Sequence, residues 1–128
     1  MKRSEISVLV VEDETSLVNV ISSILKITGI KNIDQAINGN NARQLISQTP
    51  RKTYHLMIFD TDCPVKGDGP RILEYARSLD HNPELIIASS GQEDNKKLWS
   101  GKSEANYFLL KPYSILELKK IIESHFPK

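Results

Sequence analysis

The amino-acid sequence predicts an α/β fold in which one five-stranded parallel sheet is covered by helices on both faces. Three observations lead to this prediction. Five short apolar runs alternate along the 128 residues with segments that show helical periodicity. Strands that alternate with helices pair in parallel through right-handed crossovers. The length fits one domain over residues 1–128, and no repeat or linker indicates a boundary or an output domain in this chain.

The expected strands are the short apolar runs at 6–11, 32–36, 56–59, 85–89 and 107–110. Helices are expected to follow them at 17–29, 40–47, 71–79, 94–99 and from 114 onward. Gly29 is typical of the residue that closes a helix. Ser114 and Glu117 have the spacing of a capping box at the start of the last helix. The segment at 94–99 has few apolar residues, so we expect the fourth helix to be short or irregular.

Composition excludes several classes of function. Lys plus Arg number 17 and Asp plus Glu 16, and this balance predicts neither direct nucleic-acid binding nor attraction to a membrane. The single cysteine, Cys63, cannot form an intramolecular disulfide, which favours a reducing compartment. The N-terminal apolar run is short and ends in acids, unlike a signal peptide or a membrane span. We therefore expect a cytoplasmic protein.

Polar side chains stand where the strong strands end. Glu12 and Asp13 follow the first strand, Asp60 the third, Ser90 the fourth and Lys111 the fifth. The carboxyl ends of parallel strands meet at one edge of the sheet, where sites of such folds lie. Three carboxylates there repel one another unless a cation lies among them, and oxygen ligands suit Mg²⁺ (or Mn²⁺). A carboxylate beside such a cation can attack phosphorus, with an ammonium and a hydroxyl as helpers.

Four stretches of the sequence, VLVVEDE, LMIFDTDCP, IIASSG and YFLLKPY, closely resemble the motifs of response-regulator receiver domains. They occur in the receiver order over nearly the whole chain. The resemblance implies a flavodoxin-like, doubly wound (βα)5 fold. It also implies a phosphoacceptor switch, not an enzyme, whose Asp60 accepts a phosphoryl group from the phosphohistidine of a sensor histidine kinase or a histidine phosphotransfer domain.

The resemblance also implies a role for individual residues at the metal site. Asp13 would be a direct Mg²⁺ ligand and Glu12 would act through water, while Asp60 and the backbone carbonyl of Asp62 complete the set. Lys111 would contact the phosphoryl group, and its bond to Pro112 would be cis.

Two residues are expected to switch on phosphorylation. Ser90 would move toward the phosphoryl group, and it is preferred over its neighbour Ser89 because of its register with Gly91. Phe108 stands where receivers carry a switching aromatic, but it lacks a hydroxyl and could act through packing alone. A downstream protein would then bind the face formed by the fourth helix, the fifth strand and the fifth helix.

The sequence departs from the receiver pattern in two places. Asp68 occupies the position of a common glycine, with Gly69 one residue later, so the loop after Asp60 is expected to be longer. The chain from Ser90 to Lys111 is about one residue short. Trp99, in that stretch, is expected either to anchor the fourth helix or to contact a partner.

Three other functions compete with the receiver interpretation. The pair Asp60 and Asp62 is similar to the DxD motif of haloacid-dehalogenase-type phosphatases, although that motif lies on the first strand there. An unphosphorylated docking module is typically missing an acid, the serine or the lysine, and none is missing here. A flavin-binding domain would need a phosphate-binding loop where Glu12, Asp13 and Glu14 stand.

Overall fold

The sheet is the frame of the molecule. The computed structural model describes residues 1–48, 53–62 and 67–127. Within that part of the chain, five parallel strands lie in the order β2-β1-β3-β4-β5. The strands are β1 (Ser7–Val11), β2 (Asn32–Ala36), β3 (Leu56–Asp60), β4 (Leu85–Ser90) and β5 (Tyr107–Leu110). The chain reverses its direction of travel across the sheet between β1 and β3, the position at which such folds form a crevice.

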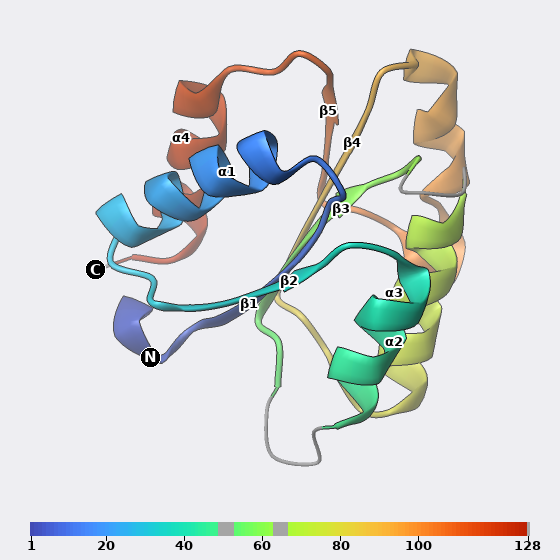
Figure 1. Cartoon of the computed structure of the whole chain (residues 1–128), viewed down its shortest axis with the longest axis horizontal. Coiled ribbons are helices and arrows are strands. Elements are labelled where there is room, and N and C mark those ends of the chain that lie inside the picture. The colour runs from blue at the N-terminus through green and yellow to red at the C-terminus, as the bar shows by residue number, and fades with distance from the viewer. Residues whose placement is uncertain (49–52, 63–66, 128) are drawn as a thin grey trace.

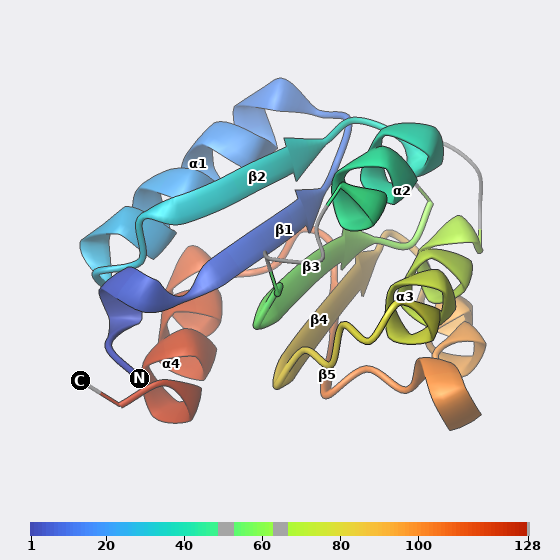
Figure 2. The ribbon, with the colours of Figure 1, turned by 90° about the horizontal axis from the view of Figure 1, so that it is seen from below.

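In the part of the chain that the structure describes, four α-helices cover the two faces, and three short 3-10 segments lie before or between the other elements. They are η1 (Arg3–Glu5), α1 (Thr15–Ile27), α2 (Gly39–Ser47), α3 (Asp68–Ser78), η2 (Glu93–Leu98), η3 (Gly101–Ser103) and α4 (Ile115–His125). Figure 2 shows α1 and α4 on one face of the sheet and α2 and α3 on the other. The doubly wound α/β fold expected from the sequence is confirmed.

Two buried apolar clusters lie on opposite faces of the sheet. Val8 and Val10 point toward α1 and α4, whereas Leu9 and Val11 point toward α2 and α3. This division follows from the two-residue period of a strand. All four valine and leucine side chains are fully buried, as expected for a strand covered on both faces.

The expected fourth helix is a 3-10 segment, η2, followed by a second short turn, η3. The prediction of a short or irregular element is therefore confirmed. Leu98 and Trp99 are the large apolar residues between 93 and 103, so no apolar stripe is available to bury an α-helix against the sheet. The fifth helix of the sequence prediction is accordingly α4, and the Ser114 side chain accepts a hydrogen bond from the Glu117 N–H at its start.

Helix α3 begins at Asp68, three residues before the start that the sequence indicated. Gly67 precedes it with φ +82°, in the left-handed region that favours glycine. Pro70 lies in the first turn, where its missing N–H breaks no helical hydrogen bond. Gly69 therefore belongs to a helix and not to a loop, whereas Cys63 and Pro64 lie outside the described residues.

Candidate functional site at the carboxyl edge of the sheet

The residues that follow the strand ends come together at one edge of the sheet. Asp60 is the last residue of β3 and pairs in register with Ser89 of β4. Ser90 ends β4 opposite Leu110 of β5, so Lys111 follows at the same level. Figure 2 shows the strands β1 to β4 pointing toward this common edge.

Three carboxylates form the centre of the site. Glu12, Asp13 and Asp60 each offer one oxygen, and these oxygens lie within 4.8 Å of one another. Glu12 and Asp60 are buried, with 3% and 8% of their surface exposed, while Asp13 is open to solvent. A cluster of carboxylate oxygens that is open to solvent at Asp13 matches the ligand preference of Mg²⁺.

The pKa of Glu12 is raised in the folded domain, in part because a second acid lies beside it. Burial raises the pKa of the Glu12 carboxyl, and the nearby charge of Asp60 raises it further. The hydrogen bond from Lys111 and the hydrogen bond from the Glu14 N–H to Glu12 Oε2, at 3.2 Å, act in the opposite direction. A divalent cation would relieve this repulsion.

Lys111 supplies the positive charge of the site. Its Nζ lies 3.0 Å from Glu12 Oε1 and 3.3 Å from Asp60 Oδ2. Burial disfavours the ammonium, but the hydrogen bond with Glu12 and the charges of Asp60 and Glu12 outweigh it and raise the pKa of Lys111. The side chain therefore stays charged beside both acids. The Lys111–Pro112 peptide bond is cis.

Asp62 contributes both its backbone and its side chain. The Asp62 N–H donates to Asp60 Oδ1 at 3.0 Å, which fixes the start of the loop against the central acid. The Asp62 carboxylate faces the end of β4, where Ser90 Oγ donates to Asp62 Oδ2 at 2.9 Å. Ser89, in contrast, donates its hydroxyl to the Phe59 carbonyl at 3.2 Å and is committed to the sheet.

Sequence reasoning missed one polar side chain at this edge, Asn95. Its Nδ2 donates to Asp62 Oδ1 at 3.0 Å and to Ser90 Oγ at 2.9 Å. Asn95 belongs to η2 and is buried. Its place could not be read from sequence, because an asparagine in a polar stretch is most simply a solvated residue.

Trp99 anchors the segment after β4 on the site. Its Nε1 donates to Thr61 Oγ1 at 2.9 Å, and its ring centroid lies 5.1 Å from that of Phe59. A Cβ on Gly69 would lie 2.8 Å from the Trp99 ring, so the glycine makes room for it. Trp99 is buried, which agrees with an anchor and not with an exposed partner contact.

Phe108 lies in β5 on the face of α2 and α3. It is partly buried and packs against the apolar cluster of that face. Its neighbour Tyr107 is 41% exposed. The Phe108 ring is therefore mostly, but not fully, covered by its neighbours.

The sequence of this chain matches a known protein family. Residues 8–123 match the family described as response regulator receiver domain. This chain belongs to that receiver family. Receiver domains are switches of two-component signalling that bind Mg²⁺ in an acidic pocket and interact with histidine kinases or phosphotransfer domains. The match removes the main ground for a phosphatase based on Asp60 and Asp62.

Individual relatives support membership of this family over most of the chain. The chain is 27% identical over 124 residues to the probable chemotaxis protein CheY of Rhizobium etli, a match that covers 95% of this chain and 93% of that protein. It is 28% identical over 122 residues to the osmosensing histidine protein kinase SLN1 of Saccharomyces cerevisiae, covering 93% of this chain and 10% of the kinase. The receiver domain of the Francisella response regulator 1452 superposes with a TM-score of 0.73 and 27% identity, over 94% of this chain and 95% of that one.

Among the described residues, no helix is both long and apolar enough to cross a bilayer.

Proposed function

We propose that this receiver domain accepts a phosphoryl group from a phosphohistidine onto Asp60, in a reaction that requires Mg²⁺, and that phosphorylation changes the surface around β5. The observation that carries the proposal is the cluster of Glu12, Asp13 and Asp60, joined by Lys111 at 3.0 and 3.3 Å. An acid cluster with one ammonium can hold a divalent cation and, beside it, a dianionic phosphoryl group.

Each residue has a separate task in this reaction. One carboxylate oxygen of Asp60 forms a bond to phosphorus while the phosphorus–nitrogen bond of the donor histidine breaks, and the freed imidazole leaves with the electron pair. Lys111 moves from pairing two acids to neutralising a phosphoryl oxygen. Ser90 donates its hydroxyl to a second phosphoryl oxygen.

The metal site is built from the same edge. Asp13 and Asp60 would bind Mg²⁺ directly, Glu12 through water, and Asp62 through its backbone carbonyl. When bound, the ion supplies charge neutralisation to the transferring phosphoryl group. The domain then catalyses its own phosphorylation and slow dephosphorylation, and no other turnover is proposed.

The phosphodonor protein has an apolar hollow to dock on beside Lys111. The hollow has a volume of about 520 Å³ and is lined by α1 and by the start of the β5–α4 connection. Leu17 and Val20 of α1 face Pro112 and Tyr113 across it. A protein bound there would hold its phosphohistidine next to the acid cluster, since Lys111 belongs to both.

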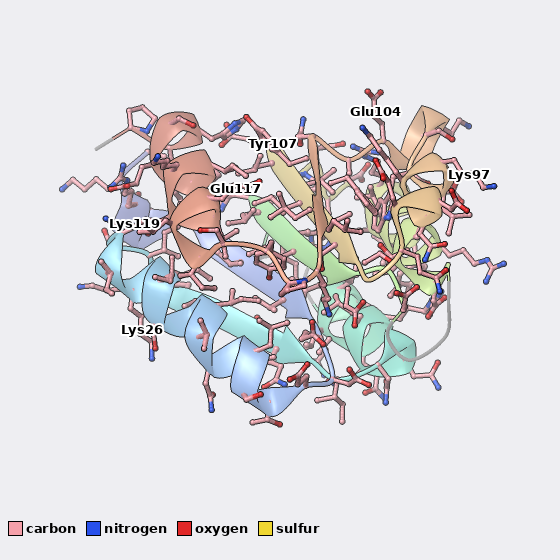
Figure 3. The ribbon with its side chains drawn as sticks, turned by 90° about the horizontal axis from the view of Figure 1, so that it is seen from above. Lys26, Lys97, Glu104, Tyr107, Glu117 and Lys119 are labelled. Carbon is pink, nitrogen blue, oxygen red and sulfur yellow. The ribbon has the colours of Figure 1, made fainter. Side chains whose placement is uncertain are left out.

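The proposed output face is formed by η2, β5 and α4. Figure 3 shows β5 between α4, with Glu117 and Lys119, and the segment that carries Lys97 and Glu104. Tyr107, Leu110 and Leu116 on these elements are 41%, 47% and 67% exposed. Exposed apolar residues among charges are typical of a surface that binds a protein partner.

The phosphoacceptor proposal is tested with acetyl phosphate as donor and intact-protein mass as readout. Wild type is expected to gain one hydroxylamine-sensitive phosphoryl group with Mg²⁺ and none with a chelator. Asp60→Asn is expected to gain none. Asp80→Asn is the matched control: Asp80 has φ +66°, a conformation that asparagine tolerates, and it follows α3 away from the acid cluster. Equal labelling of Asp60→Asn, or a wild type that never labels, contradicts the proposal. The second result favours an unphosphorylated docking module.

The output proposal is tested by amide hydrogen exchange with and without beryllofluoride, a phosphoryl mimic. Exchange is expected to change in η2 and β5 and to stay constant in β1, at the centre of the sheet. Constant exchange in η2 and β5 on saturation with the mimic contradicts a switch at this face.

A further inference from the structure

The hydroxyl of Ser90 is already engaged before any phosphoryl group arrives. Ser90 Oγ donates its single proton to Asp62 Oδ2 at 2.9 Å and accepts from the Gln92 N–H at 3.1 Å and from Asn95 Nδ2 at 2.9 Å. A hydroxyl has one proton and two lone pairs, so these three bonds use its whole capacity. Ser90 cannot donate to a phosphoryl oxygen on Asp60 without giving up Asp62.

Asn95 makes the arrangement a closed triangle. Its amide donates to Asp62 Oδ1 at 3.0 Å as well as to Ser90 Oγ. Both Asp62 oxygens are therefore acceptors, one from the serine and one from the asparagine. Ser90 and Asn95 are almost fully buried, so water competes little for these bonds. Hydrogen bonds to a carboxylate are stronger than those between neutral groups.

We propose that Asp62 and Asn95 are positioning residues that hold Ser90 away from Asp60 and thereby bias this receiver domain toward its unphosphorylated conformation. The inference rests on the proposed function, because it requires Ser90 to turn toward a phosphoryl group on Asp60. It adds that the side chain of Asp62, besides its backbone, takes part in the switch. It also gives η2 a direct role, since Asn95 must lose Ser90 when the domain is activated.

The bias has a size that can be measured. We call the hydrogen bonds among Ser90, Asp62 and Asn95 the latch. For a ligand that binds only the switched conformation, the apparent dissociation constant is the intrinsic one divided by the fraction of molecules in which the latch is open. Removing the two Asn95 hydrogen bonds is expected to tighten the binding of beryllofluoride, in the presence of Mg²⁺, by about fivefold to tenfold. The rate of phosphorylation by acetyl phosphate is expected to rise by a similar factor.

The experiment compares Asn95→Ala and the near-isosteric Asn95→Leu with wild type and with Ser103→Ala. Ser103 is the matched control because its buried hydroxyl anchors the same stretch of chain on the Pro70 carbonyl, at 3.1 Å, without touching Ser90 or Asp62. Both Asn95 variants are expected to bind beryllofluoride more tightly, and Ser103→Ala to bind like wild type. Unchanged or weaker binding by the Asn95 variants overturns the latch. Equal tightening by Ser103→Ala also overturns it, because general loosening of the segment would then suffice.

A double-mutant cycle of Asn95→Ala and Asp62→Ala, in urea without metal or mimic, tests the resting contact itself. The two changes are expected to be coupled by about fivefold in the folding equilibrium constant, and independent effects overturn the latch. This readout separates the two proposals. A wild type that fails to bind beryllofluoride and to label with phosphate refutes the proposed function, and the inference with it. A wild type that does both, with no coupling in the cycle, refutes the latch alone.

Discussion

Replacing Gly69 with alanine tests the packing that joins α3 to the site. Gly69 is the second residue of α3, and its φ is not in the left-handed region, so helix propensity alone favours alanine. The new Cβ, however, would lie 2.8 Å from Trp99 Cζ2 and 2.9 Å from Cη2. The ring cannot withdraw freely, because Phe59 lies against it and its Nε1 is bonded to Thr61. We therefore expect Gly69→Ala to destabilise the domain.

The expected change in the free energy of unfolding combines one favourable and two unfavourable contributions. Propensity favours alanine by at most about 1 kcal/mol. Overpacking of a buried ring costs about 1–3 kcal/mol. Displacement of the ring also weakens the bond to Thr61, for about 1 kcal/mol. The net expectation is a loss of about 2 kcal/mol in the free energy of unfolding, opposite in sign to the propensity.

Urea unfolding followed by circular dichroism measures this difference. The decisive comparison repeats Gly69→Ala in a Trp99→Phe background, where the atoms that the new Cβ would strike are gone. There the substitution is expected to be neutral or stabilising. If Gly69→Ala stabilises the wild-type protein, or destabilises both backgrounds equally, the account of Trp99 as an anchor is wrong.

Three further predictions concern the ends of the chain and the acids. Arg3 donates hydrogen bonds to the Phe126 carbonyl at 2.8 Å and to the Thr28 carbonyl at 3.1 Å. Arg3→Met is therefore expected to lower the free energy of unfolding by about 2–4 kcal/mol and to leave labelling by acetyl phosphate unchanged. Burial, together with the charge of a neighbouring acid, raises the pKa of Glu12 above its usual 4.5. Between pH 4.5 and this raised pKa, the folded domain binds more protons than the unfolded chain, so the free energy of unfolding without metal falls as pH rises through that window. The same pH profile of unfolding is expected to be flatter for Glu12→Gln, and an equally steep profile contradicts this prediction. Asp13→Asn is expected to weaken Mg²⁺ binding about tenfold, measured by intrinsic fluorescence, and wild-type affinity would show that Asp13 is no ligand.

The strands and the positions of the acids could be predicted because they depend on local patterns. An apolar run that stops at Glu12 or at Asp60 reads as a buried strand with a functional end, and the alternation with helices implies which ends meet. Asp13, Ser90 and Lys111 follow from the same rule, and the structure brings them to one edge with those two acids.

Asp68 shows why the rest could not be predicted. Where the resemblance leads one to expect glycine, its carboxylate bonds to both terminal nitrogens of Arg43, at 3.0 and 3.2 Å, and occupies the space in which a Cβ on Gly39 would lie. The pair joins α2 to α3 and accompanies a helix start three residues earlier than expected. Residues 25 or more apart cooperate here, and such partnerships leave no periodic signal in the sequence.

The segment after β4 is likewise held by contacts between residues far apart in the sequence. A helix with an apolar stripe would cover the sheet through many equivalent contacts, and a change at the site would reach it only through packing. Here Asn95 and Trp99 instead hold η2 by hydrogen bonds to Asp62 and Thr61, the two residues that directly follow Asp60. Because both tethers end beside Asp60, any shift of that backbone acts on η2 directly. The lack of apolar residues, which predicted a short or irregular fourth helix, is thus also the feature that connects the site to the proposed output face.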